Sequence, residues 1–248
     1  MYFVLFYLWS QFVHASQTIP FYTYYDEPPF ALEQADNLTQ KLADWLSKKS
    51  KGQYQFVPTY LPRRRLDLTV LSQADWQGVV VWASPQFFLD QERSKYLWTD
   101  TYMHDINLVV SHRNKPINFN GPASLYGLTV GSVLGRQLDD FQRDIAAGRI
   151  RREDAGSALS NLKKLQLQRI DAAFIPAIAL PYYRQQLPQL DQWLYIAKQP
   201  RSEVYRHLFV ARSQVRLHRF LNQAIVQLAH DKQWQDLLAH RNSAPPIP

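Results

Sequence analysis

The acidic side chains that could act as a general acid or base fall in two short polar stretches. Asp26 and Glu27 end an aromatic segment just before two prolines, and Asp90 and Glu92 follow a second apolar segment. Acid–base catalysis would need one of them held in a cleft beside a substrate. Each lies in a turn or at the polar start of a helix, where an exposed carboxylate is the ordinary finding. We therefore expect no catalytic residue among them.

The other residues with catalytic or metal-binding chemistry form no familiar constellation. The seven histidines include no His-Glu-x-x-His pair or other close ligand spacing. The chain has no cysteine, which excludes thiolate metal sites, a cysteine nucleophile and disulfides. The sequence also lacks a G-x-S-x-G motif, a P-loop and a G-x-G-x-x-G motif. It therefore predicts no enzyme, no metal site and no cofactor.

Basic residues outnumber acidic ones and set the charge of the chain. There are 28 Lys and Arg against 21 Asp and Glu, a net charge of +7. Such an excess favours anionic partners through long-range steering. The cations are scattered, however, and the one tight run, Arg63-Arg64-Arg65, is read as a solvated face. Without a helix-turn-helix, zinc-finger or RNA-recognition signature, we expect no nucleic-acid partner.

Strand and helix patterns alternate along the chain. Aromatic and β-branched runs predict strands, and apolar residues at helical spacing predict helices. The expected strands cover residues 19–25, 54–61, 78–83, 106–111, 128–133, 170–175, 194–197 and 207–211, with another near 150. The expected helices cover residues 38–46, 64–71, 139–147, 159–165 and 217–238. This alternation predicts an α/β fold, with mostly parallel sheets that have helices on both faces.

Two features of the chain divide it. Residues 113–122 are polar and rich in proline and asparagine, and the α/β pattern restarts after them, as at a boundary between lobes. Residues 1–13 are almost wholly apolar, and Val13-His14-Ala15 offers the small residues that a signal peptidase inspects. Although no Lys or Arg precedes the apolar run, we expect residues 1–15 to be a secretory signal cleaved after Ala15. An apolar strand or a membrane anchor is the alternative.

Four short motifs follow one another in the sequence. They are residues 25–30 (YDEPPF), Glu92-Arg93 followed by residues 98–102 (WTDTY), residues 125–131 (LYGLTVG) and residues 169–172 (RIDA). In this order they resemble motifs of the type II periplasmic solute-binding proteins of family three, which include polar amino-acid receptors of ABC importers. The resemblance covers about residues 18–240.

This resemblance implies a fold and a function. Lobe one would comprise residues 18–112 and 206–248, lobe two would be the inserted residues 113–205, and two crossing strands would form the hinge. A small solute would be captured in the cleft, chemically unchanged, by a monomer in the periplasm. The protein would pass the solute to an inner-membrane permease, or it would signal to a membrane sensor. A dehydratase acting on prephenate-like acids shares this fold class and is the enzymatic alternative.

The resemblance also implies the residues that bind the solute. Arg93 matches the arginine that grips the ligand α-carboxylate, and a surface arginine on a helix is the alternative. Trp82 and Ser84 fall at the strand end that lines the wall of lobe one, and Trp82 could instead be plain core. Tyr25 and Phe30 lie near strand ends, where aromatic rings can stack on a ligand.

Two positions depart from the family pattern. The anion-binding Gly-Thr loop of lobe two appears here as Gly135-Arg136-Gln137, and the aspartate that binds the ligand ammonium is replaced by Pro176. With Arg93 and Arg136 as candidate cations and no acidic partner, the sequence favours an anionic or neutral polar solute. Arg136 could alternatively lie on the outer face of a helix.

Overall fold

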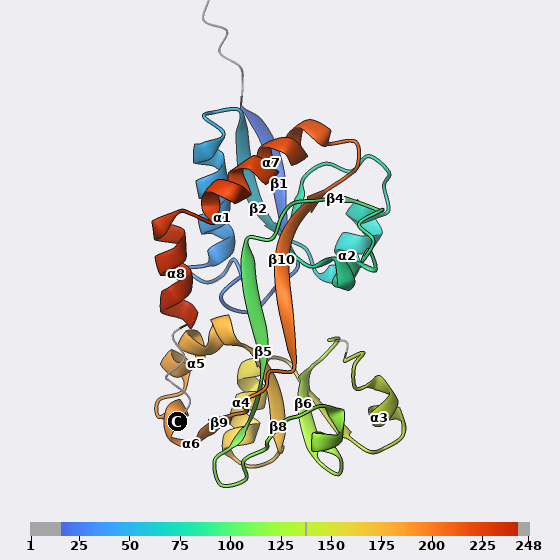
Figure 1. Ribbon diagram of the computed structural model, residues 1–248, viewed down its shortest axis with the longest axis vertical. Coiled ribbons are helices and arrows are strands. Elements are labelled where there is room, and N and C mark those ends of the chain that lie inside the picture. The colour runs from blue at the N-terminus through green and yellow to red at the C-terminus, as the bar shows by residue number, and fades with distance from the viewer. Residues whose placement is uncertain (1–15, 137, 243–248) are drawn as a thin grey trace, which may run out of the picture.

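The computed structural model describes residues 16–136 and 138–242. The chain forms two lobes, which lie one above the other in Figure 1. The long strands β5 (Met103–His112) and β10 (Ser202–Val210) run between the lobes. The two-lobed α/β fold expected from the sequence is confirmed.

The strands form one curled sheet whose two halves meet at the long strands. The order along it is β2-β1-β3-β10-β5-β8-β6-β7, with β4 beside β10 and β9 beside β5. The shorter strands are β1 (Gln17–Thr23), β2 (Tyr54–Tyr60), β3 (Val79–Ala83), β4 (Leu97–Trp98), β6 (Thr129–Val133), β7 (Arg151–Ala155), β8 (Ala172–Pro176) and β9 (Leu194–Ile196). Among the described residues, pairs between shorter strands are parallel, whereas every pair that includes β5 or β10 is antiparallel.

Each of the two long strands is shared between the lobes. Residues 202–206 of β10 pair with residues 103–107 of β5, and residues 207–210 of β10 pair with β3 and β4 of the upper lobe. Residues 107–112 of β5 pair with β8 and β9 of the lower lobe. The residue limits expected for the lobes, 18–112 with 206–248 and 113–205, fall at or within these strands and stay a prediction.

The alternation of side chains along each strand gives the upper lobe a core on both faces of its sheet. Val79 and Val81 of β3 pack with helices α1 (Leu38–Lys49), α7 (Val215–Leu228) and α8 (Lys232–Asn242), whereas Val80 packs with α2 (Arg63–Leu66). Helix α1 begins where expected, because the Asn37 side chain accepts a hydrogen bond from the Gln40 N–H at 2.7 Å.

The lower lobe is layered in the same way. Helices α4 (Ala158–Gln166), α5 (Leu180–Gln186) and α6 (Leu190–Trp193) cover one face of the strands, and a second cluster, which includes the residue just before α3 (Gln142–Ala146), covers the other. Gly131 of β6 lets α4 approach closely: a Cβ there would lie 2.8 Å from the Asn161 Oδ1 and 2.5 Å from the Ile170 Cδ1.

The C-terminal helix reaches from one lobe to the other (Figure 1). The sequence predicts a single helical region over 217–238, but the chain breaks it into α7 and α8. Trp234 of α8 packs in the same cluster as Ile178, which lies in the 3-10 turn Ala177–Ala179 after β8. None of the helices within the described ranges is long and apolar enough to cross a membrane. The predicted signal peptide, residues 1–15, lies outside the described residues.

Candidate functional site

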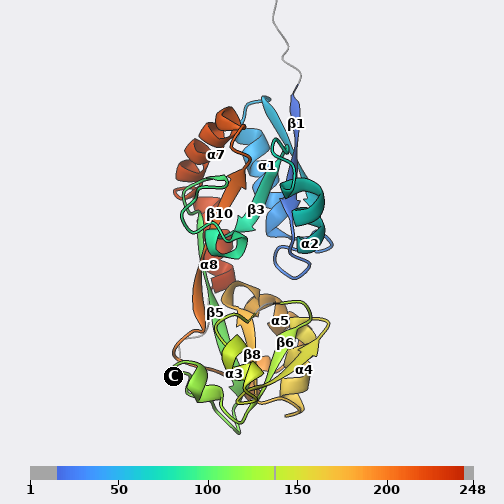
Figure 2. The ribbon, with the colours of Figure 1, turned by 90° about the vertical axis from the view of Figure 1, so that its right-hand side faces the viewer.

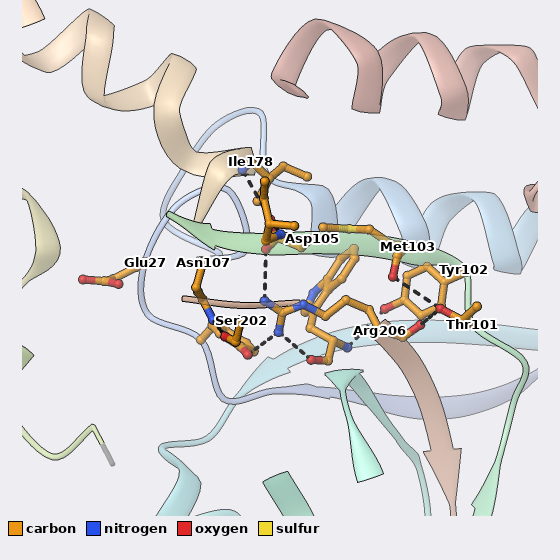
Figure 3. Close-up of polar contacts among 12 residues, drawn as sticks. Glu27, Thr101, Tyr102, Met103, Asp105, Asn107, Ile178, Ser202 and Arg206 are labelled. Atoms are coloured by element: carbon orange, nitrogen blue, oxygen red, sulfur yellow. Dashed lines mark hydrogen bonds and ion pairs between the residues drawn. The ribbon is translucent and has the colours of Figure 1, made fainter. Parts of the chain in front are cut away.

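A buried arginine lies at the centre of the region where the two lobes meet. Arg206 of β10 is 3% exposed, and its guanidinium donates hydrogen bonds to the Tyr25 hydroxyl, to the Trp82 carbonyl at 3.0 Å and to the Asp105 carboxylate at 3.3 Å. Its carbon centre lies 5.0 Å from the Tyr25 ring and 5.2 Å from the Phe30 ring. Figure 3 shows the Arg206 side chain reaching the Asp105 carboxylate. Arg206 therefore joins the Asp105 carboxylate to the aromatic residues Tyr25, Phe30 and Trp82, which form an aromatic wall.

The electrostatics of this cluster keep Arg206 charged. Burial opposes the charge, but the attractions of Tyr25 and Asp105 outweigh burial, and the pKa of Arg206 is raised. Burial also raises the pKa of Tyr102, whose hydroxyl accepts the Trp82 N–H at 3.1 Å. Tyr102 is therefore a neutral support for the wall.

Asp105 connects the cluster to the lower lobe. One oxygen of its carboxylate accepts the Ile106 N–H at 2.9 Å and lies 3.5 Å from the N–H of Ile178, in the turn after β8. The other oxygen pairs with Arg206. Groups from both long strands and from the lower lobe thus meet at one carboxylate.

A second polar contact bridges the lobes at Glu27, to one side of the Arg206 cluster (Figure 3). Glu27 follows β1 in the upper lobe, and one of its oxygens accepts the Ala158 N–H, the first of α4, at 2.7 Å. Its other oxygen pairs with the guanidinium of Arg136, in the turn after β6. The sequence led us to expect an exposed carboxylate, but Glu27 is only 8% exposed because both oxygens have partners across the lobes.

A hollow of about 320 Å³ lies between the lobes. Pro28 and Pro29 line it from the upper lobe, and Pro181, Tyr182 and Gln185 line it from the lower lobe. Its volume lies at the lower end of the range for small-molecule pockets, about 300 to 1,000 Å³.

The structure brings three of the predicted site residues together. Tyr25, Phe30 and Trp82 all contact the Arg206 guanidinium or one another, with ring centroids 5.1 Å apart for Tyr25 and Phe30 and 4.5 Å apart for Phe30 and Trp82. Tyr25 is half-buried. Phe30 and Trp82 are buried in the core of the upper lobe, and the Trp82 indole donates to the Thr39 hydroxyl at 2.8 Å. Phe30 and Trp82 are therefore the buried part of the aromatic wall, and they support the half-buried Tyr25 ring.

Trp82 also has unusual backbone geometry. Its φ is 60°, in the left-handed region, which costs a bulky residue on the order of 1–3 kcal/mol. In this conformation its carbonyl accepts hydrogen bonds from Arg206 and, at 3.4 Å, from the Tyr24 hydroxyl. The end of β3 is thus shaped to present this carbonyl to the arginine.

The other predicted residues of the upper lobe lie apart from this cluster. Arg93 is exposed in a turn, with its N–H bonded to the Asp90 carbonyl at 2.8 Å, and within the described residues its side chain has no ion pair. Ser84 is buried at the start of a 3-10 turn, and its hydroxyl caps no N–H there. Their roles in binding stay predictions.

The expectation that Asp90 is an exposed carboxylate is wrong. It is 2% exposed, and its carboxylate accepts the N–H groups of Ser94 at 2.7 Å, Lys95 at 2.9 Å and Tyr96 at 3.2 Å, and the Trp98 indole N–H at 2.7 Å. Burial alone would raise the pKa of Asp90, but these hydrogen bonds outweigh it and lower the pKa. Asp90 therefore organises the turn that carries Arg93.

Arg136 of the lower lobe turns toward the upper lobe. The sequence left open whether this side chain faces the cleft or the outside, and its pairing with Glu27 directs it toward the upper lobe. Pro176 ends β8, and its side chain has no atom that can accept a hydrogen bond from a ligand ammonium group. Glu27 is the acidic group that the structure offers instead at the junction.

Arg206 and Asp105 are the residues that the sequence analysis missed. Arg206 directly precedes the apolar run at residues 207–211, and Asp105 directly precedes the run at residues 106–111. The strands expected from the sequence therefore began one residue after each of them. In the structure β10 and β5 extend through them. A charged residue of opposite sign at the start of each run was the available signal. Within the described ranges no three His, Asp or Glu residues are grouped to hold a metal ion.

Comparison with known proteins adds structural likeness only. No protein-family model and no curated protein sequence matches the chain. An ancestral arginine-binding protein bound to arginine superposes with a TM-score of 0.68 at 16% identity, over 93% of this chain and 100% of that one. A putative L-cystine ABC transporter protein from Listeria monocytogenes gives 0.67 at 14% identity, over 92% and 97%.

A third structure agrees with these two. A probable amino-acid ABC transporter extracellular-binding protein from Bacillus subtilis gives a TM-score of 0.69 at 16% identity, over 92% of this chain and 99% of that one. The fold is therefore that of the two-lobed periplasmic binding proteins.

Proposed function

We propose that this protein captures a small polar solute between its two lobes and releases it chemically unchanged. The observation that carries the proposal is the bridge at Glu27, where a carboxylate of the upper lobe meets N–H and guanidinium donors of the lower lobe. Groups from two lobes that face each other across a junction can close around a solute. The likeness to amino-acid-binding proteins supports the same role.

The proposed solute is a zwitterion of the amino-acid class. The sequence favoured an anion because Arg93 and Arg136 were both counted as unpaired cations. Arg136 is paired with Glu27, and the buried Arg206 is paired with Asp105, so the charges at the junction are balanced. The names of the similar structures support this choice too, since they mention arginine, glutamine and L-cystine and no purely anionic solute.

We assign the contacts as follows. Tyr25, the half-exposed ring of the wall, stacks against the solute, and Arg93, also of the upper lobe, is the proposed partner of the solute carboxylate. Phe30 and Trp82 position this ring, and Ser84, just after β3, is a further proposed contact of the solute. Arg136 of the lower lobe or Glu27 of the upper lobe meets a further charged group of the solute.

The likeness to periplasmic binding proteins also supports a proposal about where the protein works. We propose that residues 1–15 direct export, that the mature monomer works in the periplasm, and that an inner-membrane permease receives the solute. A membrane sensor as the partner would use the same closure. A crosslink from the solute-loaded protein to a transporter subunit or to a sensor kinase would distinguish import from signalling.

A thermal-shift screen of the mature protein tests the proposal. The panel should contain the common L-amino acids, small dicarboxylates and neutral sugars. A solute at about a hundred times its Kd adds about 2.7 kcal/mol of stability, enough to raise Tm measurably. We expect an amino acid to give the largest shift. A rise in Tm only with dicarboxylates would favour the anionic solute that the sequence predicted. Chemical conversion of a compound by the protein would indicate an enzyme.

A further inference from the structure

We propose that Glu27 is an internal latch that holds the two lobes together in the solute-free protein, because its carboxylate occupies an anion-binding position of the lower lobe. Both of its oxygens are engaged by the lower lobe: one by the Ala158 N–H at 2.7 Å and the other by the Arg136 guanidinium. The Glu27 side chain is 11% exposed, whereas the Arg136 side chain is 36% exposed, so Glu27 is the buried member of this pair.

The lower lobe builds this anion position from several groups. Helix α4 has nine residues, and the Ser157 hydroxyl already caps the Ser160 N–H at 3.1 Å, which leaves the Ala158 N–H for another acceptor. The positive end of the helix dipole favours a carboxylate there. Arg136 adds a full positive charge, and Arg152 holds the Arg136 carbonyl with a hydrogen bond of 2.9 Å.

The groups around Glu27 leave it as the one acidic partner of Arg136 among the described residues. Tyr183 of α5 is buried nearby, and burial together with the Glu27 charge raises the pKa of its hydroxyl, which stays neutral. No other acidic side chain within the described ranges forms an ion pair with Arg136. Removal of the Glu27 carboxylate would leave the Ala158 N–H and the guanidinium without an acceptor from the protein.

This arrangement has a consequence for solute entry. A solute carboxylate that uses these donors must displace Glu27, so the free energy of the latch opposes binding of the solute. The inference concerns the solute-free protein and does not depend on which solute the protein captures. It can therefore be tested separately from the proposed function.

The chain has no cysteine, so two spin labels can be placed without background. The labels are attached at Arg64→Cys in α2 and at Lys163→Cys in α4. Both positions are exposed, and the two helices lie in different lobes on the same side of the molecule (Figure 2). Pulsed electron spin resonance then measures the distance between the lobes in the dialysed protein. Glu27→Gln keeps the side-chain shape and removes the charge. Glu33→Gln, an exposed glutamate nearby in sequence, is the matched control.

We expect Glu27→Gln to shift the distance distribution to longer and broader values, and Glu33→Gln to leave it unchanged. Arg136→Gln should act in the same direction, and the double variant should open no further than the more open single variant. Far-UV circular dichroism checks that each variant is folded, and Arg136→Gln carries the test if Glu27→Gln does not fold. Distributions of folded Glu27→Gln or Arg136→Gln that coincide with the parent would overturn the latch.

Discussion

Arg206 and Asp105 lie on the two strands that join the lobes, and their side chains meet at 3.3 Å with 3% and 1% of their surfaces exposed. In the ladder between β10 and β5, Arg206 stands opposite Met103 and Asp105 opposite Val204, so the pair is diagonal across the strands. We expect a buried pair of this kind to contribute more to the relative register of the two strands than to the stability of the fold.

Loss of one partner should therefore destabilise the protein more than loss of both. Arg206→Met leaves the Asp105 charge buried without its cation, and we expect it to lower the free energy of unfolding by about 3–5 kcal/mol. Arg206→Met combined with Asp105→Asn should recover part of this loss, because no buried charge remains. Urea unfolding of both variants measures the difference. A double variant less stable than Arg206→Met would contradict this reading of the pair.

The close approach of α4 to β6 at Gly131 gives a second prediction. A Cβ at Gly131 would meet Ile170 at 2.5 Å and Asn161 at 2.8 Å, so Gly131→Ala should destabilise the protein by about 1–3 kcal/mol. Gly156→Ala is the matched control, since nothing lies within 4 Å of its added Cβ. Thermal unfolding compares the two. Equal Tm values for both variants would show that the contact at Gly131 relaxes freely.

The turn held by Asp90 predicts a pH dependence. Because the pKa of Asp90 is lowered in the folded protein, the stability it contributes is present above its unfolded pKa of about 4 and is lost as the pH falls through the folded value. Asp90→Asn should cost about 2–4 kcal/mol near neutral pH, since a neutral amide accepts fewer of these hydrogen bonds. The gap in Tm between the two proteins should narrow below about pH 4. A gap that stays constant down to pH 3 would rule out this role of the carboxylate.

Export gives a prediction that needs no structure. Expression of the full chain in a bacterium with a periplasm should yield a mature protein that begins at Ser16, because Ala15 ends the expected signal. N-terminal sequencing and intact mass of the periplasmic fraction measure this. Recovery of the chain only in the cytosol, with Met1 intact, would show that residues 1–15 are not a signal.

The sequence predicted most of the fold because the strands that build it are strongly apolar. The run at residues 79–83 is buried on both faces, and the cap at Asn37 marks the start of α1, so both were recognisable without coordinates. The two-residue strand β4 and the short helices α5 and α6 were missed, since each is too short to show a period of its own.

The site was less accessible to sequence analysis than the fold. Arg93 and Arg136 were recognised from their positions in motifs, but pairing depends on contacts between distant segments. Glu27 and Arg136 are separated by 109 residues, and Asp105 and Arg206 by 101. Neither local spacing nor composition contains this information. The charges were therefore counted as unpaired, and the sequence favoured an anionic solute.

Isothermal titration calorimetry can establish whether the solute that the protein binds is a zwitterion. The amino acid with the largest thermal shift is titrated beside two analogues: the acid that lacks its α-amino group and the amine that lacks its α-carboxylate. We expect 1:1 binding of the intact amino acid, at least about tenfold tighter than either analogue, because loss of one charge-assisted contact costs about 1.5–3 kcal/mol. Equal or tighter binding of the acid without its amino group would contradict a zwitterionic solute.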